Sequence, residues 1–83
     1  MHLKIIWDEE AYKELNKLDS FVSKRIEKKI LELSEKLYSL DVKKLKGTNY
    51  LRLRVGDYRV IFDVQGNTII ILKVGHRRKI YKN

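Results

Sequence analysis

The sequence predicts a small α+β fold in which an N-terminal strand and two helices precede a three-stranded antiparallel meander. In the first half of the chain, apolar residues recur with helical spacing, and in the second half they alternate with polar residues with a period of two. Glycine-containing turn signals divide the second half into strands. We expect residues 1–83 to form a single domain in which both helices pack on one face of the sheet.

The first strand and helix are expected at the N-terminus. Residues 2–7 include β-branched and aromatic side chains, which favour a strand. Asp8 has the features of an N-cap, and the helix behind it is expected to run to about Leu18. Trp7 and Tyr12 have the spacing of a hydrophobic staple, which would fix the angle at which the chain enters this helix.

A longer helix is expected next. Asp19 and Ser20 supply its N-cap, and apolar residues step by three or four positions from Val22 to Leu40. Such a stripe, with charged residues on the other faces, is typical of a helix that covers a core. Residues 42–49, which contain three lysines and a glycine, are expected to form a loop.

The second half is expected to form the meander. Residues 50–55 alternate strictly, and the Gly-Asp pair at 56–57 is a two-residue hairpin signal. Residues 58–64 form the next predicted strand. Residues 68–74 are apolar on both faces, which indicates a strand with neighbours on both sides. Residues 75–83 are expected to form a polar tail.

Positive charge is concentrated in the second half. Residues 1–41 carry 8 basic and 9 acidic side chains, whereas residues 42–83 carry 11 basic and only 2 acidic ones, and the formal net charge of the chain is +8. An excess segregated in this way indicates a surface that binds a polyanion rather than an evenly solvated exterior. We expect the ligand to be a nucleic acid, and RNA in particular.

The composition argues against several other classes. The chain has no cysteine, so disulfides and thiolate metal sites are excluded. His2 and His76 are far apart and belong to no zinc-binding motif, so neither a metal nor another cofactor is expected. No segment has the apolar length of a signal peptide or a membrane span, which predicts a cytoplasmic protein without membrane contact.

Basic residues of the second half are expected to meet on one face of the sheet. The alternation in residues 50–55 places Arg52 and Arg54 opposite the core, and Arg59 follows on the next strand. Arginine suits such a surface, because its guanidinium group binds phosphates in a bidentate manner and stacks on bases. Further nucleic-acid-binding candidates flank these strands: Lys44, Lys46, His76, Arg77 and Arg78.

Three tyrosines lie among these basic residues. Tyr50, Tyr58 and Tyr81 are able to stack on unpaired bases. Strand propensity explains Tyr50 and Tyr58 equally well, as side chains that pack on a sheet. The sequence leaves both alternatives open.

The second half contains two distinctive segments, YLRLRVGDYRVIFDV at 50–64 and ILKVGHRRKIY at 71–81, with the basic loop KLKG at 44–47 before them. Together they resemble the RelE branch of the RelE/ParE toxin superfamily, and the order of elements matches along essentially the whole chain. The resemblance implies a type II toxin that enters the ribosomal A site and cuts mRNA there as a metal-independent endoribonuclease. It also implies a RelB-like antitoxin that wraps and silences the toxin in a hetero-oligomer.

The resemblance implies roles for individual residues. Arg59, just after the hairpin, and Arg77, after the last strand, match arginines that bind and neutralise the scissile phosphate. Tyr81 matches a C-terminal tyrosine that assists the attack of the ribose 2′-hydroxyl or orients the base. Lys46 matches a basic residue of the preceding loop.

The predicted site lacks an obvious general base. Arg52 and Tyr50 stand where RelE has lysines, and an arginine cannot practically lose its proton. Tyr81 needs its pKa lowered from about 10, which neighbouring arginines favour. His76 has a suitable intrinsic pKa, although its place in a tail does not put it in a site. The arginines can stabilise charge that develops on the phosphate. The predicted catalytic group is Arg52, Arg59, Arg77 and Tyr81.

Two other functions remain open. A toxin of the ParE kind would act on DNA gyrase without cutting RNA, and a plain RNA-binding module would not be toxic. Arg77, Arg78 and Tyr81, close behind the last strand, favour the RelE kind over the ParE kind.

Overall fold

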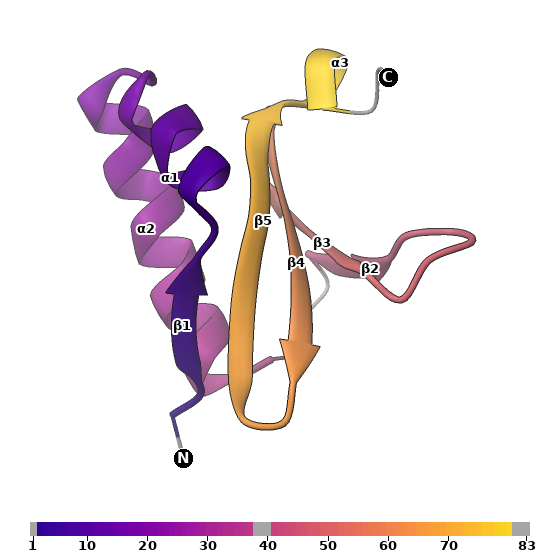
Figure 1. Cartoon of the computed structure of the whole chain (residues 1–83). Helices are drawn as coiled ribbons and strands as arrows, with labels where there is room; N and C mark the ends of the chain where they lie inside the picture. The colour runs from indigo at the N-terminus through magenta and orange to yellow at the C-terminus, as the bar shows by residue number, and fades with distance from the viewer. Residues whose placement is uncertain (1, 38–40, 81–83) are drawn as a thin grey trace.

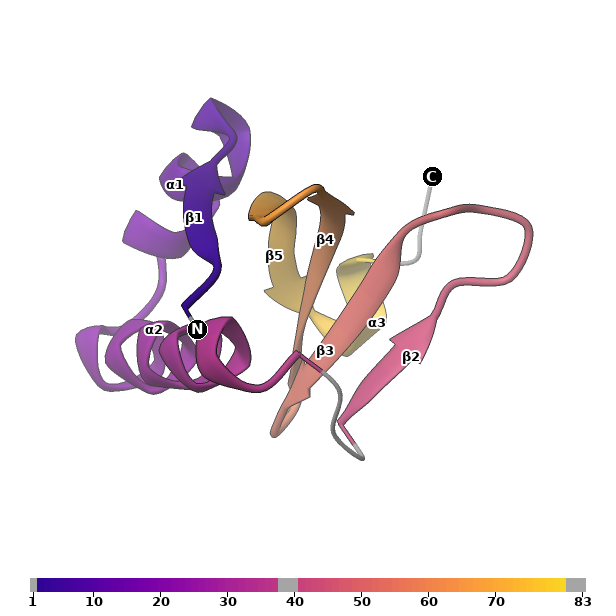
Figure 2. The ribbon, with the colours of Figure 1, turned by 90° about the horizontal axis from the view of Figure 1, so that it is seen from below.

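The computed structural model describes residues 2–37 and 41–80. Its elements, in chain order, are β1 (Lys4–Trp7), α1 (Glu9–Asn16), α2 (Ser20–Glu35), β2 (Val42–Lys44), β3 (Leu51–Val55), β4 (Tyr58–Gln65), β5 (Thr68–His76) and α3 (Arg77–Ile80). The strands form one sheet in the order β1-β5-β4-β3-β2 (Figure 1). Both long helices lie on one side of this sheet, as the view from below shows (Figure 2). The predicted α+β class is confirmed.

Both long helices begin where the sequence predicts. The carboxylates of Asp8 and Asp19 each accept a hydrogen bond from the backbone N–H two residues later, at 3.1 and 2.9 Å. The rings of Trp7 and Tyr12 meet edge to face with 5.9 Å between their centroids, which confirms the predicted staple. Local side-chain chemistry therefore sets the start of each helix.

Both helices end earlier than predicted. α1 ends at Asn16, and α2 ends at Glu35, where the backbone of Lys36 becomes extended with φ −139° and ψ 94°. Leu37 still packs against the core although it is no longer helical, and Leu40 lies outside the described residues. An apolar stripe predicts which side chains reach the core, but it does not require that the backbone remain helical.

The sheet corrects three sequence-based expectations. β1 pairs in parallel with β5, so the sheet is antiparallel only among the other four strands. Part of the predicted loop at 42–49 is a strand, because Val42–Lys44 pairs with β3 at the sheet edge. The predicted tail at 75–83 begins inside β5 and continues as α3, while residues 81–83 lie outside the described part. Tertiary pairing stabilises these short segments, which have little apolar pattern of their own.

A β-bulge changes which residues of β5 face the core. Ile61 lies opposite Lys73, but the next residue, Phe62, lies opposite Ile71, so Leu72 is an extra residue on β5. Because the bulge shifts the alternation by one, Ile71 before it and Val74 after it both point into the core. β5 lies between β1 and β4, as predicted.

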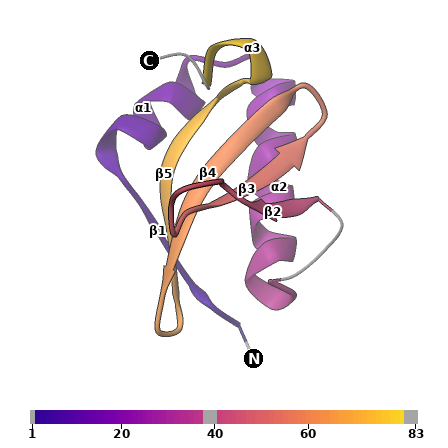
Figure 3. The same cartoon turned by 90° about the vertical axis from the view of Figure 1, so that its right-hand side faces the viewer.

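The core fills the space between the two long helices and the sheet. Its buried members are Ala11, Leu15, Ile26, Ile30, Leu33, Leu53, Val55, Val60, Phe62, Ile69, Ile71 and Val74. The opposite side of the sheet, called the outer face below, is free of α1 and α2, and in Figure 3 β3 and β4 lie in front of α2. Within residues 2–37 and 41–80, no helix is long and apolar enough to cross a membrane.

Candidate nucleic-acid interface

A row of basic side chains crosses the outer face from β2 to β5. Arg52 of β3 lies between Lys43 of β2 and Ile61 of β4, and Ile61 lies opposite Lys73 of β5. Directly paired residues project from the same side of a sheet, so the side chains of Lys43, Arg52 and Lys73 share one face. Ile61 is only 9% exposed although it is outside the core cluster. Its low exposure indicates that the stems of its long neighbours cover it.

Sequence analysis selected Lys44 of the pair that precedes β3, but its neighbour Lys43 is the one that lies on the outer face. Lys44 lies opposite Leu51, which packs against the core, so Lys44 is on the helix side of the sheet. Lys43, which sequence analysis did not select, shares the outer face with Arg52. Lys46 is exposed in the loop between β2 and β3. Treating residues 42–44 as a strand would have identified Lys43, because alternation alone separates it from Lys44.

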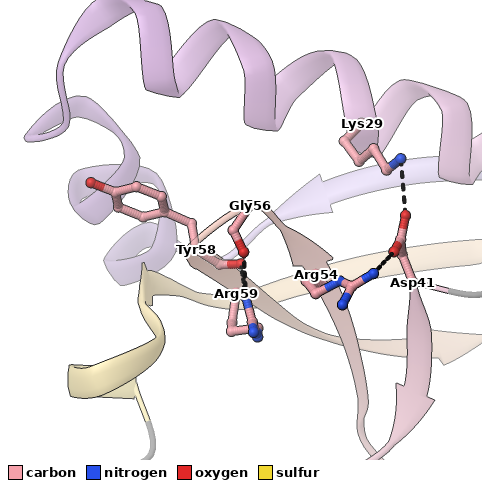
Figure 4. A network of polar contacts seen from close by, with 6 residues as sticks. All are labelled: Lys29, Asp41, Arg54, Gly56, Tyr58 and Arg59. Atoms are coloured by element: carbon pink, nitrogen blue, oxygen red, sulfur yellow. Dashed lines mark hydrogen bonds and ion pairs between the residues drawn. The ribbon is translucent and has the colours of Figure 1, made fainter.

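A second row contains two arginines that are direct cross-strand neighbours. Arg54 of β3 pairs with Arg59 of β4, which in turn pairs with Gly75 of β5. Like charges directly opposite one another destabilise a sheet. Each of the two guanidinium groups therefore needs its own acceptors, and Figure 4 shows that they turn away from one another toward different partners.

Arg54 turns toward the end of α2. Its Nη2 donates to the Asp41 carboxylate at 3.0 Å, and Lys29 Nζ lies 3.1 Å from the other carboxylate oxygen (Figure 4). Hydrogen bonds from Lys29 and then from Arg54 hold the pKa of Asp41 below its ordinary value. Arg54, predicted to bind nucleic acid, is thus held in an ion-pair network that joins β3 to α2.

Arg59 turns toward the β3–β4 hairpin turn. Its Nη1 donates to the carbonyl oxygens of Gly56 at 2.8 Å and of Tyr58 at 2.9 Å (Figure 4). Gly56 has φ +58°, which primed hairpin turns require and glycine adopts without strain. The turn thus fixes one edge of the guanidinium group.

Arg52 and Arg59 also carry donors without a partner. The Nε–H groups of both are buried, and neither makes a hydrogen bond within the described residues. A buried unsatisfied donor is costly, and native proteins keep few of them without a reason. Because these Nε atoms are buried, an anion such as phosphate would meet the outer nitrogens of the two guanidinium groups, which project from paired strands of one face.

α3 brings Arg77 to the same end of the sheet. The Arg77 N–H donates to the Asp57 carbonyl at 2.8 Å, and Arg77 Nε lies 3.9 Å from the Asp57 carboxylate. Ile80 is 6% exposed and lies against Gly75, which faces the outer side beside Arg59. The helix that follows β5 therefore folds back over the outer face, instead of extending away as a tail.

His76 is separated from Arg52, Arg54 and Arg59 by the sheet. It pairs with Tyr58, whose side chain packs against the core, and the two rings meet edge to face at 5.5 Å. Its Nδ1 accepts a hydrogen bond from the N–H of Arg78 at 3.1 Å. Both rings are thus on the helix side of the sheet, so Tyr58 packs against the protein, as one of the two alternatives predicted. Tyr50 is 43% exposed, so the stacking alternative stays open for it. Tyr81 lies outside the described residues.

Of the outer-face arginines, Arg54 lines a hollow, whereas Arg52 and Arg59 do not. One hollow of about 580 Å³ lies between α2 and the β3–β4 turn, and another of about 580 Å³ lies between α1, β5 and α3. Neither Arg52 nor Arg59 lines them. No group of three His, Asp or Glu side chains suited to a metal ion occurs in the described part of the chain. An open basic surface suits a polymer that runs across it better than a small molecule.

The sequence matches a known family along most of its length. A family described as the ParE toxin of the type II toxin–antitoxin system, parDE, matches residues 5–81. Toxin RelE3 of Methanocaldococcus jannaschii is 40% identical over 85 aligned positions, which cover 95% of this chain and 96% of that toxin.

Solved structures of high similarity include three complexes of toxin with antitoxin. The RelB-RelE complex from Methanococcus jannaschii has a chain that is 38% identical with a TM-score of 0.75, over 92% of this chain and 94% of that one. The RelE-RelB complex from Pyrococcus horikoshii OT3 has a chain that is 30% identical with a TM-score of 0.79, and the match covers 95% of this chain and 99% of that one. A chain of the RelBE2 complex from Mycobacterium tuberculosis, 22% identical over 93% and 100%, shares the fold with a TM-score of 0.83.

Proposed function

Because the chain belongs to the RelE/ParE family of toxins of type II toxin–antitoxin systems, we propose that it cuts mRNA in the ribosomal A site. The reaction is a metal-independent endoribonuclease reaction that stops translation in the cytoplasm. The observation that carries the proposal is that Arg52 and Arg59 project from paired strands on the outer face, with Nε–H groups that no acceptor of the described residues satisfies.

The arginine surface supports cleavage of the phosphodiester by the neighbouring ribose. In this reaction the 2′-oxygen forms a bond to phosphorus while the bond from phosphorus to the 5′-oxygen breaks. The 2′-hydroxyl loses a proton, the departing 5′-oxygen gains one, and the phosphoryl oxygens become more negative. Arg52, Arg59 and Arg77 are proposed to bind these oxygens, since fixed donors at developing charge lower the barrier strongly.

The proton of the 2′-hydroxyl needs an acceptor. Between the two candidates, the position of His76 on the helix side, with Nδ1 already accepting from Arg78, argues against it. Tyr81 follows α3 by one residue, and α3 packs on the outer face. We therefore propose Tyr81 as the group that accepts the proton.

A RelB-like antitoxin is the proposed partner. The solved relatives from Methanococcus jannaschii and Pyrococcus horikoshii are complexes of RelE with RelB. The net charge of +8 on this chain would attract an acidic segment, which would also mask the arginines that bind RNA. Antitoxin and toxin would then form a hetero-oligomer in which the toxin is inactive.

The test is a primer-extension assay of mRNA on active ribosomes. Wild type is expected to produce new ends at the A-site codon, and Arg59→Ala or Arg77→Ala to lower the rate about 10²- to 10³-fold. Lys44→Ala, on the helix side, is the control that removes a nearby charge. Intact mRNA with wild-type toxin would disprove the proposal.

A second candidate follows from the name of the matching family. ParE-type toxins would act on DNA gyrase, and the family that matches residues 5–81 is described as ParE. Loss of gyrase supercoiling activity on addition of the toxin, without new mRNA ends, would favour this function over the first.

A further inference from the structure

The β3–β4 hairpin turn contacts both arginines that flank the proposed phosphate site. The Gly56 carbonyl accepts from Arg59 Nη1 at 2.8 Å, and the Asp57 carbonyl accepts from the Arg77 N–H at 2.8 Å. Arg59 and Arg77 are distant in sequence and belong to different elements, β4 and α3. Two adjacent residues of one turn therefore set the positions of two functional side chains.

The turn itself is firmly held. It closes between the paired residues Val55 and Tyr58, and Gly56 adopts φ +58°. The guanidinium group of Arg25 on α2 lies over it, since a Cβ placed on Gly56 would be 3.2 Å from Arg25 Nη1. A rigid turn transmits its position to whatever it binds, so small changes at Asp57 would displace Arg77.

The Asp57 backbone carbonyl binds the Arg77 N–H, whereas the Asp57 carboxylate faces the Arg77 side chain. It lies 3.9 Å from Arg77 Nε, and the two side chains are 72% and 52% exposed. An exposed pair at this distance is weak and easily exchanged for another anion. A phosphate, with more charge and better geometry for a guanidinium group, would replace the carboxylate.

We propose that the Asp57 carboxylate is the resting counter-ion of Arg77 and is displaced when the RNA phosphate binds. This inference rests on the proposed function, in that it takes Arg77 as a phosphate ligand. The carboxylate keeps the guanidinium group near the turn in the free protein. It also competes with the ligand, so it lowers RNA affinity.

Asp57→Asn tests this role, because it removes the charge but keeps the shape and suits a hairpin turn. Affinity is measured by fluorescence anisotropy with an RNA oligonucleotide that carries 2′-deoxyribose at the cleaved position. We expect binding to tighten about two- to fivefold, the value of one exposed ion pair. On ribosomes, the saturating cleavage rate is expected to stay within about twofold of wild type. The carboxylate is already displaced when RNA is bound, and the backbone carbonyl that holds the Arg77 N–H is retained.

Two controls isolate the contact with Arg77. Glu10→Gln removes an equal charge from the exposed first turn of α1 and is expected to change neither quantity. In an Arg77→Ala background, Asp57→Asn is expected to lose its effect on affinity, because the two side chains act as a pair.

The outcomes separate this inference from the proposed function. Tightening that disappears in the Arg77→Ala background supports it, even if wild type cuts no RNA, since the binding measurement does not depend on cleavage. Unchanged affinity, or equal tightening in both backgrounds, would overturn the counter-ion role. A saturating rate that falls about tenfold in an active enzyme would overturn the displacement, because the carboxylate would then act in the RNA-bound state.

Discussion

Replacement of Gly75 by alanine gives a quantitative test of how α3 is held on the outer face. A Cβ on Gly75 would lie 3.8 Å from Ile80 Cβ and 3.9 Å from two other atoms of that side chain, which is ordinary contact. The φ of Gly75 is not among the positive values, so alanine can adopt it. We expect Gly75→Ala to raise the free energy of unfolding by about 0.5–1 kcal/mol, chiefly by restricting the unfolded chain.

Two further glycine variants show how large a change in the free energy of unfolding to expect from backbone strain and from loss of the Ile80 contact. Gly66→Ala has free space around the new methyl group but φ +61°, so it is expected to cost about 1–2 kcal/mol from backbone strain alone. Gly75→Val adds methyl groups that would overlap Ile80 and expel it. Loss of the burial of Ile80, now 6% exposed, is expected to cost about 1.5–3 kcal/mol and to release Arg77.

Urea unfolding followed by the fluorescence of Trp7 measures the stability of all three glycine variants. Trp7 is the single tryptophan and packs against the core, so it reports on global unfolding. If Gly75→Val were no more destabilising than Gly75→Ala, then Ile80 would not lie over Gly75 as described, and the placement of α3 and Arg77 would be refuted.

Three other predictions follow from features of the sheet and core. Lys43→Ala is expected to reduce by about one the slope of log affinity for RNA against log salt concentration, while Lys44→Ala leaves it unchanged; equal slopes would contradict the face assignment. In wild type, the ionised Asp41 carboxylate is expected to stabilise the fold above about pH 4, and this stability is lost as pH falls through the lowered pKa of Asp41. Asp41→Asn is expected to lack this pH-dependent stability, which is measured as the urea midpoint against pH. Identical curves for the two proteins would contradict this. Phe62→Ala, at a fully buried position, is expected to cost about 3–5 kcal/mol in urea unfolding, and a loss below 1 kcal/mol would contradict its place in the core.

Local chemistry made much of the fold predictable from the sequence. The caps at Asp8 and Asp19 and the staple between Trp7 and Tyr12 depend on neighbouring residues only, so their patterns are visible in the chain. Strict alternation likewise placed Arg52 on the face opposite the core. These features were predicted correctly because nothing distant is needed to form them.

What the sequence missed depends on distant contacts. Lys43 reaches the outer face only because Val42–Lys44 pairs with β3, and three residues are too few to show a period. Arg54 was expected to bind nucleic acid, but its partner Asp41 comes from a loop that the pattern of β3 does not specify. The fold of α3 over Gly75 requires contacts between β5 and residues beyond it.

The extra residue at Leu72 gives β5 room for a change in chain length as well as in side chain. Substitution of Leu72 would alter one half-buried contact, whereas its deletion would remove the bulge and leave Lys73 opposite Ile61 and Val74 in the core layer, because Ile71 and Lys73 would then alternate regularly. Gly75 would still face outward beside Arg59, so the seat of α3 would be kept. A gap of one residue between Ile71 and Lys73 in the alignment of a relative would therefore indicate a straighter strand with the same outer face, whereas a gap of one residue between Lys73 and Gly75 would turn one of these outward positions toward the core.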